Sequence, residues 1–397
     1  MNVGIDSISL CVPESFYPLT DLAEKHGIDP NKYLYGLGQE KMSVPSPDED
    51  IVTLAAGAAN PILTDDVRAS VSTVILATES GIDQSKSAGL FVHGLLGIKS
   101  NCRVIEFKQA CYGATAALQM ATDMVRQRPD EKILIIASDI ARYEQDSLGE
   151  CTQGAGALAM IISANPRLLN LHHARGMHSF DVMDFWRPNG HKAAQVDGHL
   201  SIEVYLESMR QAWNNYKDNG GHQLSELPWL CFHQPFTKMS KKAFTALKEN
   251  EPQQGAELTD LSYEHSLLYG RQIGNTYTAS LYIGLLSLLE NNPQDLTEQN
   301  IGLFSYGSGS VGEFFSAQVV PGYRQHLRVK EHQEMLSNRQ ALSHEKYASW
   351  FYQSLADHEN QIMPKFSNRE FRLEKVDGFR RVYGVNTPES NELKKVS

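Results

Sequence analysis

The chain has 397 residues, of which 41% are hydrophobic and 21% charged, and its formal net charge is −11. The length allows two or three domains or one large fused core. The acidic balance argues against nucleic-acid binding, because phosphates attract clusters of Lys and Arg.

Short apolar segments alternate with helical patterns along the chain. Residues 2–10 alternate in polarity, which favours a first strand over a signal peptide. Further strands are predicted at 71–77, 102–107, 132–137 and 301–306, and helices at 51–60, 86–97, 112–127, 202–217 and 278–290. This alternation predicts the α/β class with largely buried central sheets.

Two segments resemble each other. Residues 153–162 and 306–315 are both Gly-x-Gly turns that lead into apolar strands. The similarity favours two related halves, although a Gly-x-Gly before a strand is commonly just a tight turn.

The chain from Gly322 to about Phe366 is polar and helix-prone. Four apolar residues are spaced as one helical face: Tyr347, Trp350, Phe351 and Leu355. We predict an appended C-terminal helical segment, followed by a strand at 371–376.

Two features of the sequence bear on the cellular location. No apolar run approaches the ~18 residues of a membrane span. The five cysteines form neither a CxxC pair nor a regular framework. We therefore expect a cytoplasmic protein in a reducing compartment, with no membrane contact.

Cys111 is the first candidate for chemistry, because it lies where the strand predicted at 102–107, taken to be buried, turns into the helix predicted at 112–127. The free N–H groups and dipole at a helix start favour an anion, so we expect a lowered thiol pKa and a reactive thiolate. The alternative is that Cys111 is a small core residue.

Glu79 directly follows the strand predicted at 71–77. Desolvation would raise the pKa of this carboxyl group and allow it to exchange protons near neutrality. The alternative is a loop carboxylate that caps the helix beginning near Ser85.

His233 follows an apolar run and is flanked by Phe232, Pro235 and Phe236. It could donate a hydrogen bond to a carbonyl or stabilise a thiolate, or it could be structural. Three cations follow within about one turn, namely Lys238, Lys241 and Lys242. They suit a phosphate-bearing ligand, but they could equally form a solvated helix face.

Two glycine-containing segments complete the candidates. Asn275, after Gly274, can donate and accept at once, or can simply be an N-cap. In the segment 305–310 the glycines allow backbone N–H groups to approach a ligand, and one of them could form an oxyanion hole with the Cys111 N–H.

Several other kinds of site are not indicated. There is neither a dinucleotide-binding glycine motif nor a Walker loop. His172, His173 and His178 lie close in sequence but lack the spacing of a metal site. We expect no metal.

Taken together in this order and spacing, Glu79, Cys111, His233 and Asn275 resemble the thiolase superfamily, and specifically the 3-hydroxy-3-methylglutaryl-CoA synthase family. The resemblance covers nearly the whole chain and is carried by 3–6, 36–39, 77–80, 109–112, 141–143, 152–157, 184–188, 232–239, 274–275 and 304–314. Because so many segments match in the same order along the chain, the resemblance to this family is specific.

The resemblance implies a five-layered αβαβα fold of two similar halves and a homodimer. We assign the halves to 1–165 and 166–397, the second with a helical insertion at about 322–366. The substrates would be acetyl-CoA and acetoacetyl-CoA, with no separate cofactor.

The resemblance also implies the roles of individual residues. Cys111 would take the acetyl group, Glu79 would remove a methyl proton, and His233 would polarise the C3 carbonyl of acetoacetyl-CoA, with Asn275 helping to place the substrate. Water would then release the product from Cys111.

The remaining implied residues bind substrate. Lys238 and Lys242 would face the CoA phosphates, and the Ser308 amide would join that of Cys111 around the oxyanion. Tyr143, Thr152 and Asp184 would support the site.

Other readings stay open. Residues 79–83 and 101–103 look somewhat like the branch that acts on acyl carrier proteins in polyketide synthesis, whereas 184–188 favour the mevalonate branch. A ketoacyl synthase III-like enzyme would not need Glu79, and a biosynthetic thiolase would want a second late cysteine, which is not present after Cys231. Outside the enzymes, the chain could be a CoA-binding scaffold protein without catalytic activity.

Cys151, beside the expected site, departs from the pattern of the family and could alter pocket volume or oxidation sensitivity.

Overall fold

The structure is a computed structural model that describes residues 1–355 and 359–386. Within these residues, no helix is long and apolar enough to cross a membrane. Nine strands form the main sheet, in the order β11-β12-β13-β8-β1-β7-β6-β4-β5.

The first half of the chain contributes five of these strands. Their bounds are β1 Val3–Cys11, β4 Val71–Ala77, β5 Arg103–Phe107, β6 Lys132–Ala141 and β7 Gly154–Ala164. β4 is parallel to both β5 and β6, while β7 is antiparallel to β6 and β1. The carboxyl ends of β4 and β5 therefore lie side by side.

The second half contributes four strands. Their bounds are β8 Leu169–Ser179, β11 Trp229–Phe232, β12 Asn300–Gly307 and β13 Val311–Val319. β12 is parallel to β11 and antiparallel to β13. The order β4-β6-β7-β1 in the first half matches β11-β12-β13-β8 in the second, each with one parallel pairing followed by two antiparallel pairings. The predicted similarity between the halves is therefore present in the fold.

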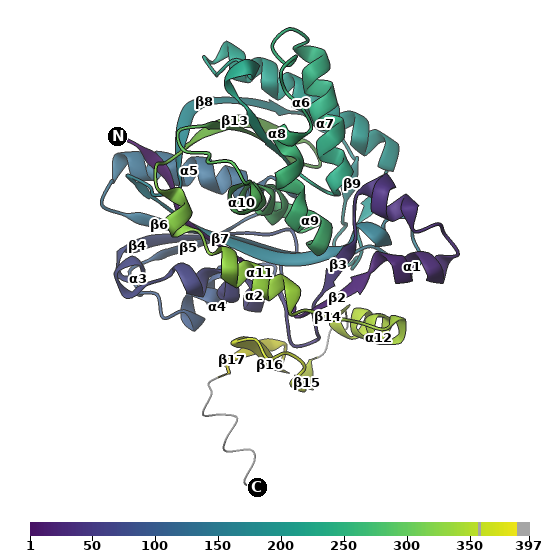
Figure 1. The fold of residues 1–397 in the computed structure, drawn as a ribbon. Helices are drawn as coiled ribbons and strands as arrows, with labels where there is room; N and C mark the ends of the chain where they lie inside the picture. Colours follow the sequence, from purple (N-terminus) through teal and green to yellow (C-terminus); the bar gives the residue numbers. More distant parts are fainter. Residues whose placement is uncertain (356–358, 387–397) are drawn as a thin grey trace.

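Helices divide the molecule into layers (Figure 1). Their bounds are α2 Ile51–Ala59, α4 Ala88–Leu95, α5 Gly113–Gln127, α6 Gly198–Asp218, α7 Thr237–Asn250 and α10 Ser280–Asn291. Helices α5 and α10 share one core with strands of both halves, α2 and α4 cover the other face of the first half, and α6 and α7 cover that of the second. Because the central core lies between the strands of the two halves, the layers follow the predicted order αβαβα.

Alternation along β6 shows how the sequence specifies these layers. Ile133 and Ile135 point into the central core, whereas Leu134 and Ile136 point toward α2 and α4. Because both faces are covered, the strand is apolar without interruption from Ile133 to Ala137. The two halves meet where β1 and β8 pair at Gly4 and Ile5. The assigned division at 165 and 166 lies between β7 and β8 and stays a prediction.

One expectation about burial was wrong. The strand before Cys111 was expected to be buried, but β5 is the last strand of the sheet, and Ile105 is 42% exposed. A strand without an outer neighbour leaves alternate side chains uncovered, which the sequence alone does not reveal.

Smaller elements connect or cover these layers. They are β2 Ser15–Pro18, α1 Leu19–His26, η1 Lys32–Leu37, β3 Lys41–Val44, η2 Asn60–Ile62, α3 Asp65–Ser70, η3 Glu150–Thr152, β9 Phe185–Trp186, β10 Gln195–Val196, η4 Leu224–Glu226, α8 Leu261–Glu264, η5 His265–Leu267, α9 Leu268–Ile273 and η6 Tyr277–Ala279.

The stretch assigned to a helical insertion is more mixed than predicted. It contains η7 Tyr323–His326, α11 Val329–Ser337, β14 Gln340–Ala341, α12 His344–Leu355 and β15 Asn360–Ile362. Tyr347, Trp350 and Phe351 are buried as one face of α12, as predicted. The side chain of Leu355, the fourth residue of that face, lies outside the described residues.

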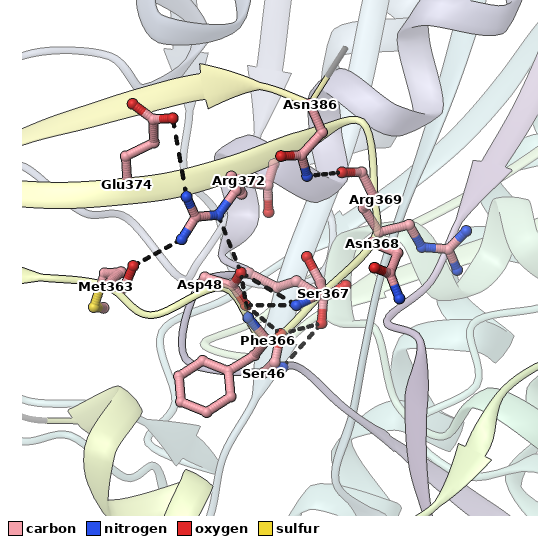
Figure 2. Close-up of polar contacts among 12 residues, drawn as sticks. Ser46, Asp48, Met363, Phe366, Ser367, Asn368, Arg369, Arg372, Glu374 and Asn386 are labelled. Atoms are coloured by element: carbon pink, nitrogen blue, oxygen red, sulfur yellow. Dashed lines mark hydrogen bonds and ion pairs between the residues drawn. The ribbon is translucent and has the colours of Figure 1, made fainter. Parts of the chain in front are cut away.

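A small C-terminal sheet of β15, β16 Phe371–Asp377 and β17 Arg380–Val385 is anchored through Asp48 (Figure 2). This fully buried carboxylate accepts hydrogen bonds from the backbone N–H groups of Phe366 and Ser367 and forms an ion pair with Arg372 at 3.3 Å. Charged hydrogen bonds of this kind hold the segment against the first half.

Candidate active site

Cys111 lies two residues before α5, as predicted from the sequence. Ala110 just before it adopts a left-handed backbone conformation, with φ of 43°, so the chain turns sharply between β5 and the helix. Cys111 is 8% exposed and packs with Ala141 and Tyr277. The turn therefore places the thiol in a largely water-free pocket.

The Cys111 thiol donates a hydrogen bond to Oε1 of Glu79 at 3.1 Å. Glu79 follows β4 and Cys111 follows β5, so the parallel pairing of these strands brings the two residues together. The alternative role for Glu79 is not observed, because Ser87 caps α4. Desolvation, and then the nearby Asp139 carboxylate, raise the pKa of Glu79 to about 8, as the sequence predicted in direction.

The expected lowering of the thiol pKa was wrong. Burial and then the adjacent Glu79 carboxylate hold the pKa of Cys111 well above its ordinary value. The start of α5 does not compensate for these two effects. Cys111 therefore rests as a thiol, and a base must accept its proton before or during attack, which Glu79 is placed to do.

Sequence reasoning missed Asp139, which organises this part of the site. Its carboxylate accepts hydrogen bonds from the N–H groups of Glu79, Ser80 and Thr278 and from the hydroxyl of Thr78. It is buried, and desolvation raises its pKa even though these hydrogen bonds act in the opposite direction. The available signal was a polar residue within β6, but the strand predicted at 132–137 stopped short of it.

His233 follows β11 and is 3% exposed. Its Nδ1 lies 2.7 Å from the hydroxyl of Ser280, which itself accepts a hydrogen bond from the N–H of Gln234. The Ser280 proton is therefore available to Nδ1, which leaves Nε2 as the N–H donor of the ring. Burial lowers the pKa of His233 to about 3, so the ring is neutral at physiological pH.

The glycine-rich loop after β12 contacts the Cys111 turn. Gln109 donates through Nε2 to the backbone oxygen of Ser308 at 3.2 Å. Gly307 lies so close to the turn that an added Cβ would stand 2.6 Å from the Gln109 oxygen. The Ser308 and Cys111 amides, predicted to form an oxyanion hole, thus belong to two segments in direct contact.

Asp184 forms hydrogen bonds with the same glycine-rich loop. Its fully buried carboxylate accepts hydrogen bonds from the Tyr306 hydroxyl at 2.7 Å and from the Gly309 N–H at 2.9 Å. Tyr205 packs edge-on against Tyr306 and donates through its hydroxyl to the backbone oxygen of His233. These contacts connect the segment after β11 to the loop beside the thiol.

Three predicted substrate-binding residues surround the pocket. Tyr143 is buried, hydrogen-bonds Thr152 through its hydroxyl and packs edge-on against Phe185. Asn275 accepts the Tyr277 N–H through Oδ1 at 2.9 Å, a turn-capping contact that also leaves its NH₂ group as the end able to donate to a ligand. Tyr277, which contacts the thiol, was not singled out from the sequence.

The predicted phosphate-binding lysines lie on α7, which begins four residues after His233. Lys238 donates to the backbone oxygen of Tyr35 at 3.2 Å, and Lys241 pairs with Asp260 at 3.4 Å. Lys242 has no hydrogen-bond or ion-pair partner among the described residues. Lys238 and Lys242 are partly buried, so their placement is compatible with either a ligand contact or a solvated face.

The structure brings a buried thiol and a carboxyl group of raised pKa into contact, and it connects the neutral imidazole of His233 to the loop beside them through Tyr205 and Tyr306. Such a set can form a thioester on the thiol, remove a proton next to a carbonyl and polarise a second carbonyl. These are the groups that a carbon–carbon condensation requires.

Comparisons with known proteins agree with this geometry. The model for the N-terminal part of hydroxymethylglutaryl-coenzyme A synthase matches residues 1–167, and that for its C-terminal part matches residues 170–260 and 251–386. The hydroxymethylglutaryl-CoA synthase of Enterococcus faecalis is 46% identical over 355 residues, which are 89% of this chain and 93% of that protein. The polyketide biosynthesis 3-hydroxy-3-methylglutaryl-ACP synthase PksG of Bacillus subtilis is 31% identical over 94% of this chain and 92% of its own.

Solved structures give the same result. An HMG-CoA synthase complexed with CoA superposes with a TM-score of 0.93 at 39% identity, covering 97% of this chain and 100% of the other. MvaS in complex with 3-hydroxy-3-methylglutaryl coenzyme A gives a TM-score of 0.90 at 33% identity, covering 97% and 99%. The family models and these relatives show that the chain belongs to the hydroxymethylglutaryl-CoA synthase family, with a thiolase-type fold.

Proposed function

We propose that this protein condenses acetyl-CoA with acetoacetyl-CoA and water to give 3-hydroxy-3-methylglutaryl-CoA and free CoA. The observation that carries the proposal is the 3.1 Å hydrogen bond between the Cys111 thiol and Glu79 in a buried pocket. A nucleophile and a base of raised pKa share one proton there. Membership of the family supports the choice of substrates.

In the first step, the Cys111 sulfur attacks the acetyl carbonyl as Glu79 accepts the thiol proton. A new carbon–sulfur bond forms, the bond to the CoA sulfur breaks, and CoA leaves with a proton. The backbone amides of Cys111 and Ser308 stabilise the oxyanion during this exchange.

In the second step, Glu79 removes a proton from the methyl group of acetyl-Cys111. The resulting carbanion attacks the C3 carbonyl of acetoacetyl-CoA, and the new alkoxide takes a proton from protonated Glu79, which restores the carboxylate. His233 donates its Nε2–H to the C3 oxygen as charge develops, and as a neutral donor it does not compete for the proton on Glu79. Water then cleaves the thioester on Cys111 and releases the product.

The remaining site residues bind and orient the substrates. Lys238 and Lys242 contact the CoA phosphates from the first two turns of α7. Asn275 donates to the acceptor through its NH₂ group, and Tyr143 with Thr152 forms the wall of the acyl pocket. Asp184 holds the Ser308 loop in place. We propose no cofactor beyond these CoA thioesters.

The acceptor is proposed to arrive on CoA, which places the enzyme in mevalonate formation. The higher identity to the Enterococcus enzyme, 46% against 31% for the polyketide relative, favours this branch. We also propose a cytoplasmic homodimer. β5 supports the dimer, because it is an edge strand with Ile105 exposed and can pair with a second copy.

The test compares acceptors. Enzyme and acetyl-CoA are mixed with either acetoacetyl-CoA or acetoacetyl acyl carrier protein, and products are separated by mass. We expect turnover with the CoA acceptor and at most weak turnover with the carrier protein. The reverse preference would assign the chain to the polyketide branch, and turnover of malonyl thioesters instead would indicate a ketoacyl synthase III-like enzyme.

A further inference from the structure

A second cluster of ligating side chains lies outside the catalytic pocket. His26 ends α1, Asp146 lies in the loop between β6 and β7, and Glu150 begins η3. The Nε2 atom of His26 is 3.3 Å from an Asp146 carboxylate oxygen and 3.6 Å from a Glu150 oxygen. One ligand atom from each of the three residues lies within 4.8 Å of those of the other two. Residues about 120 positions apart in sequence therefore converge on one point.

When the ring proton of neutral His26 is on Nδ1, the atoms that converge there are all acceptors. Nδ1 of His26 lies 3.5 Å from the Tyr33 hydroxyl, while Nε2 is shielded from solvent and has no hydrogen-bond partner. The two carboxylates have no proton to offer it. In that tautomer three lone pairs face one another, and a metal ion between them would satisfy all three.

The cluster is also held in place from outside. Glu150 is 2% exposed; its Oε1 accepts from the Tyr347 hydroxyl at 2.7 Å and its Oε2 from the Asp146 N–H at 2.8 Å. Contacts of this kind fix the orientation of metal ligands in proteins. The Asp146 side chain is 76% exposed, which leaves a path for an ion and for water as a further ligand.

We propose that His26, Asp146 and Glu150 bind a divalent cation of intermediate hardness, of which Zn²⁺ is the best match. Ligand atoms at about 2.0–2.1 Å from a tetrahedral ion stand roughly 3.3 Å apart, close to the two separations that involve His26. One imidazole and two carboxylates with an open fourth position suit this ion better than Ca²⁺, which takes six to eight oxygen ligands.

The ion connects α1 to the loop that joins two substrate-pocket residues. Residues 144–151 run directly from Tyr143 to Thr152. Gly149 in this loop lies so close to the Tyr143 ring that an added Cβ would stand 2.5 Å from the ring. Metal binding therefore holds the loop that backs the acyl pocket, without taking part in the chemistry.

The test is a binding titration of the chelator-treated full-length protein with Zn²⁺, followed by calorimetry, with Co²⁺ as a spectroscopic probe. Variants His26→Gln and Asp146→Asn remove a ligand each, and both side chains are partly or largely exposed, so folding is preserved. Glu144→Gln is the matched control, because this exposed residue lies in the same loop and loses the same charge.

We expect one tight site per chain, at least ~10-fold weaker binding in both ligand variants, and no change in Glu144→Gln. Bound Co²⁺ should show ligand-field bands without a thiolate charge-transfer band. Bound metal should raise the unfolding temperature of the parent protein and of Glu144→Gln, but not of the two ligand variants. Binding that is unaffected by His26→Gln, a thiolate band, or no stoichiometric binding would overturn the proposal.

Discussion

Exchange of the acetyl methyl hydrogens with solvent should follow the ionisation of Glu79. Only the ionised carboxylate can remove a methyl proton, and desolvation together with Asp139 raises the pKa of Glu79 to about 8. The thiol hydrogen bond of Cys111 lowers this pKa, and acetylation removes that hydrogen bond. In the acetyl-enzyme the pKa should therefore lie at or above its value in the free enzyme.

The size of the effect follows from that pKa. With a pKa of about 8, roughly half of Glu79 is ionised at pH 8 and about 1% at pH 6, so exchange should slow by ~50-fold over this range. Glu79→Gln has the same shape but no basic form. It should lose exchange by ~10²–10⁴-fold. Acetylation should slow much less than exchange, because the variant removes the base for the thiol proton but also the carboxylate that raises the thiol pKa.

The assay mixes enzyme with acetyl-CoA in deuterated buffer, quenches, and measures deuterium in the acetyl group on Cys111 by mass spectrometry. It isolates proton removal from acceptor binding and from hydrolysis. A rate that is flat between pH 6 and pH 8, or an equal rate in Glu79→Gln, would refute the assignment of Glu79 as the base.

Three further predictions concern the rest of the site. His233→Ala should leave acetylation intact but slow condensation by ~10²-fold or more, measured as product formation at saturating acetyl-CoA; a loss confined to acetylation would contradict the donor role. Asp139→Asn should lower the free energy of unfolding by about 2–3 kcal/mol in urea titrations, because the buried groups that donate to Asp139 lose their charged acceptor. Asp83 is exposed, so Asp83→Asn should change this free energy little. Lys242→Ala should raise the KM for acetyl-CoA several-fold with little change in kcat. Lys241 pairs with Asp260, so Lys241→Ala should leave this KM unchanged. Equal effects of the two variants would indicate that the lysines form a solvated face of α7 and do not bind CoA.

The sequence was most informative where chemistry and strand ends coincide. Glu79, Cys111 and His233 could each be selected because a polar or reactive residue directly follows an apolar strand, and the structure brings Glu79 and Cys111 into contact. Strand pairing supplies that contact, and pairing is a long-range property. The pattern therefore indicated the candidate residues without showing that two of them share a proton.

What the sequence could not supply depends on burial and on neighbours. The thiol pKa was expected to fall because the local pattern shows a helix start, but it does not show how deeply Cys111 is buried. Asp139 was missed because a polar residue late in a strand has no meaning until Thr78 and Thr278 are placed around it. In the cluster of His26 with Asp146 and Glu150, only the two carboxylates are near one another in sequence, and His26 comes from a distant segment.

The central claim is that Cys111 carries the acetyl group that becomes part of the product. The most direct test is intact-protein mass spectrometry after mixing with acetyl-CoA, followed by a chase with acetoacetyl-CoA, with Cys111→Ala as the control. We expect one acetyl adduct on Cys111 that the chase converts to 3-hydroxy-3-methylglutaryl-CoA, and no adduct in the variant. Product formation without an adduct, or an adduct that persists in Cys111→Ala, would contradict it, and neither adduct nor product would favour a silent CoA-binding scaffold.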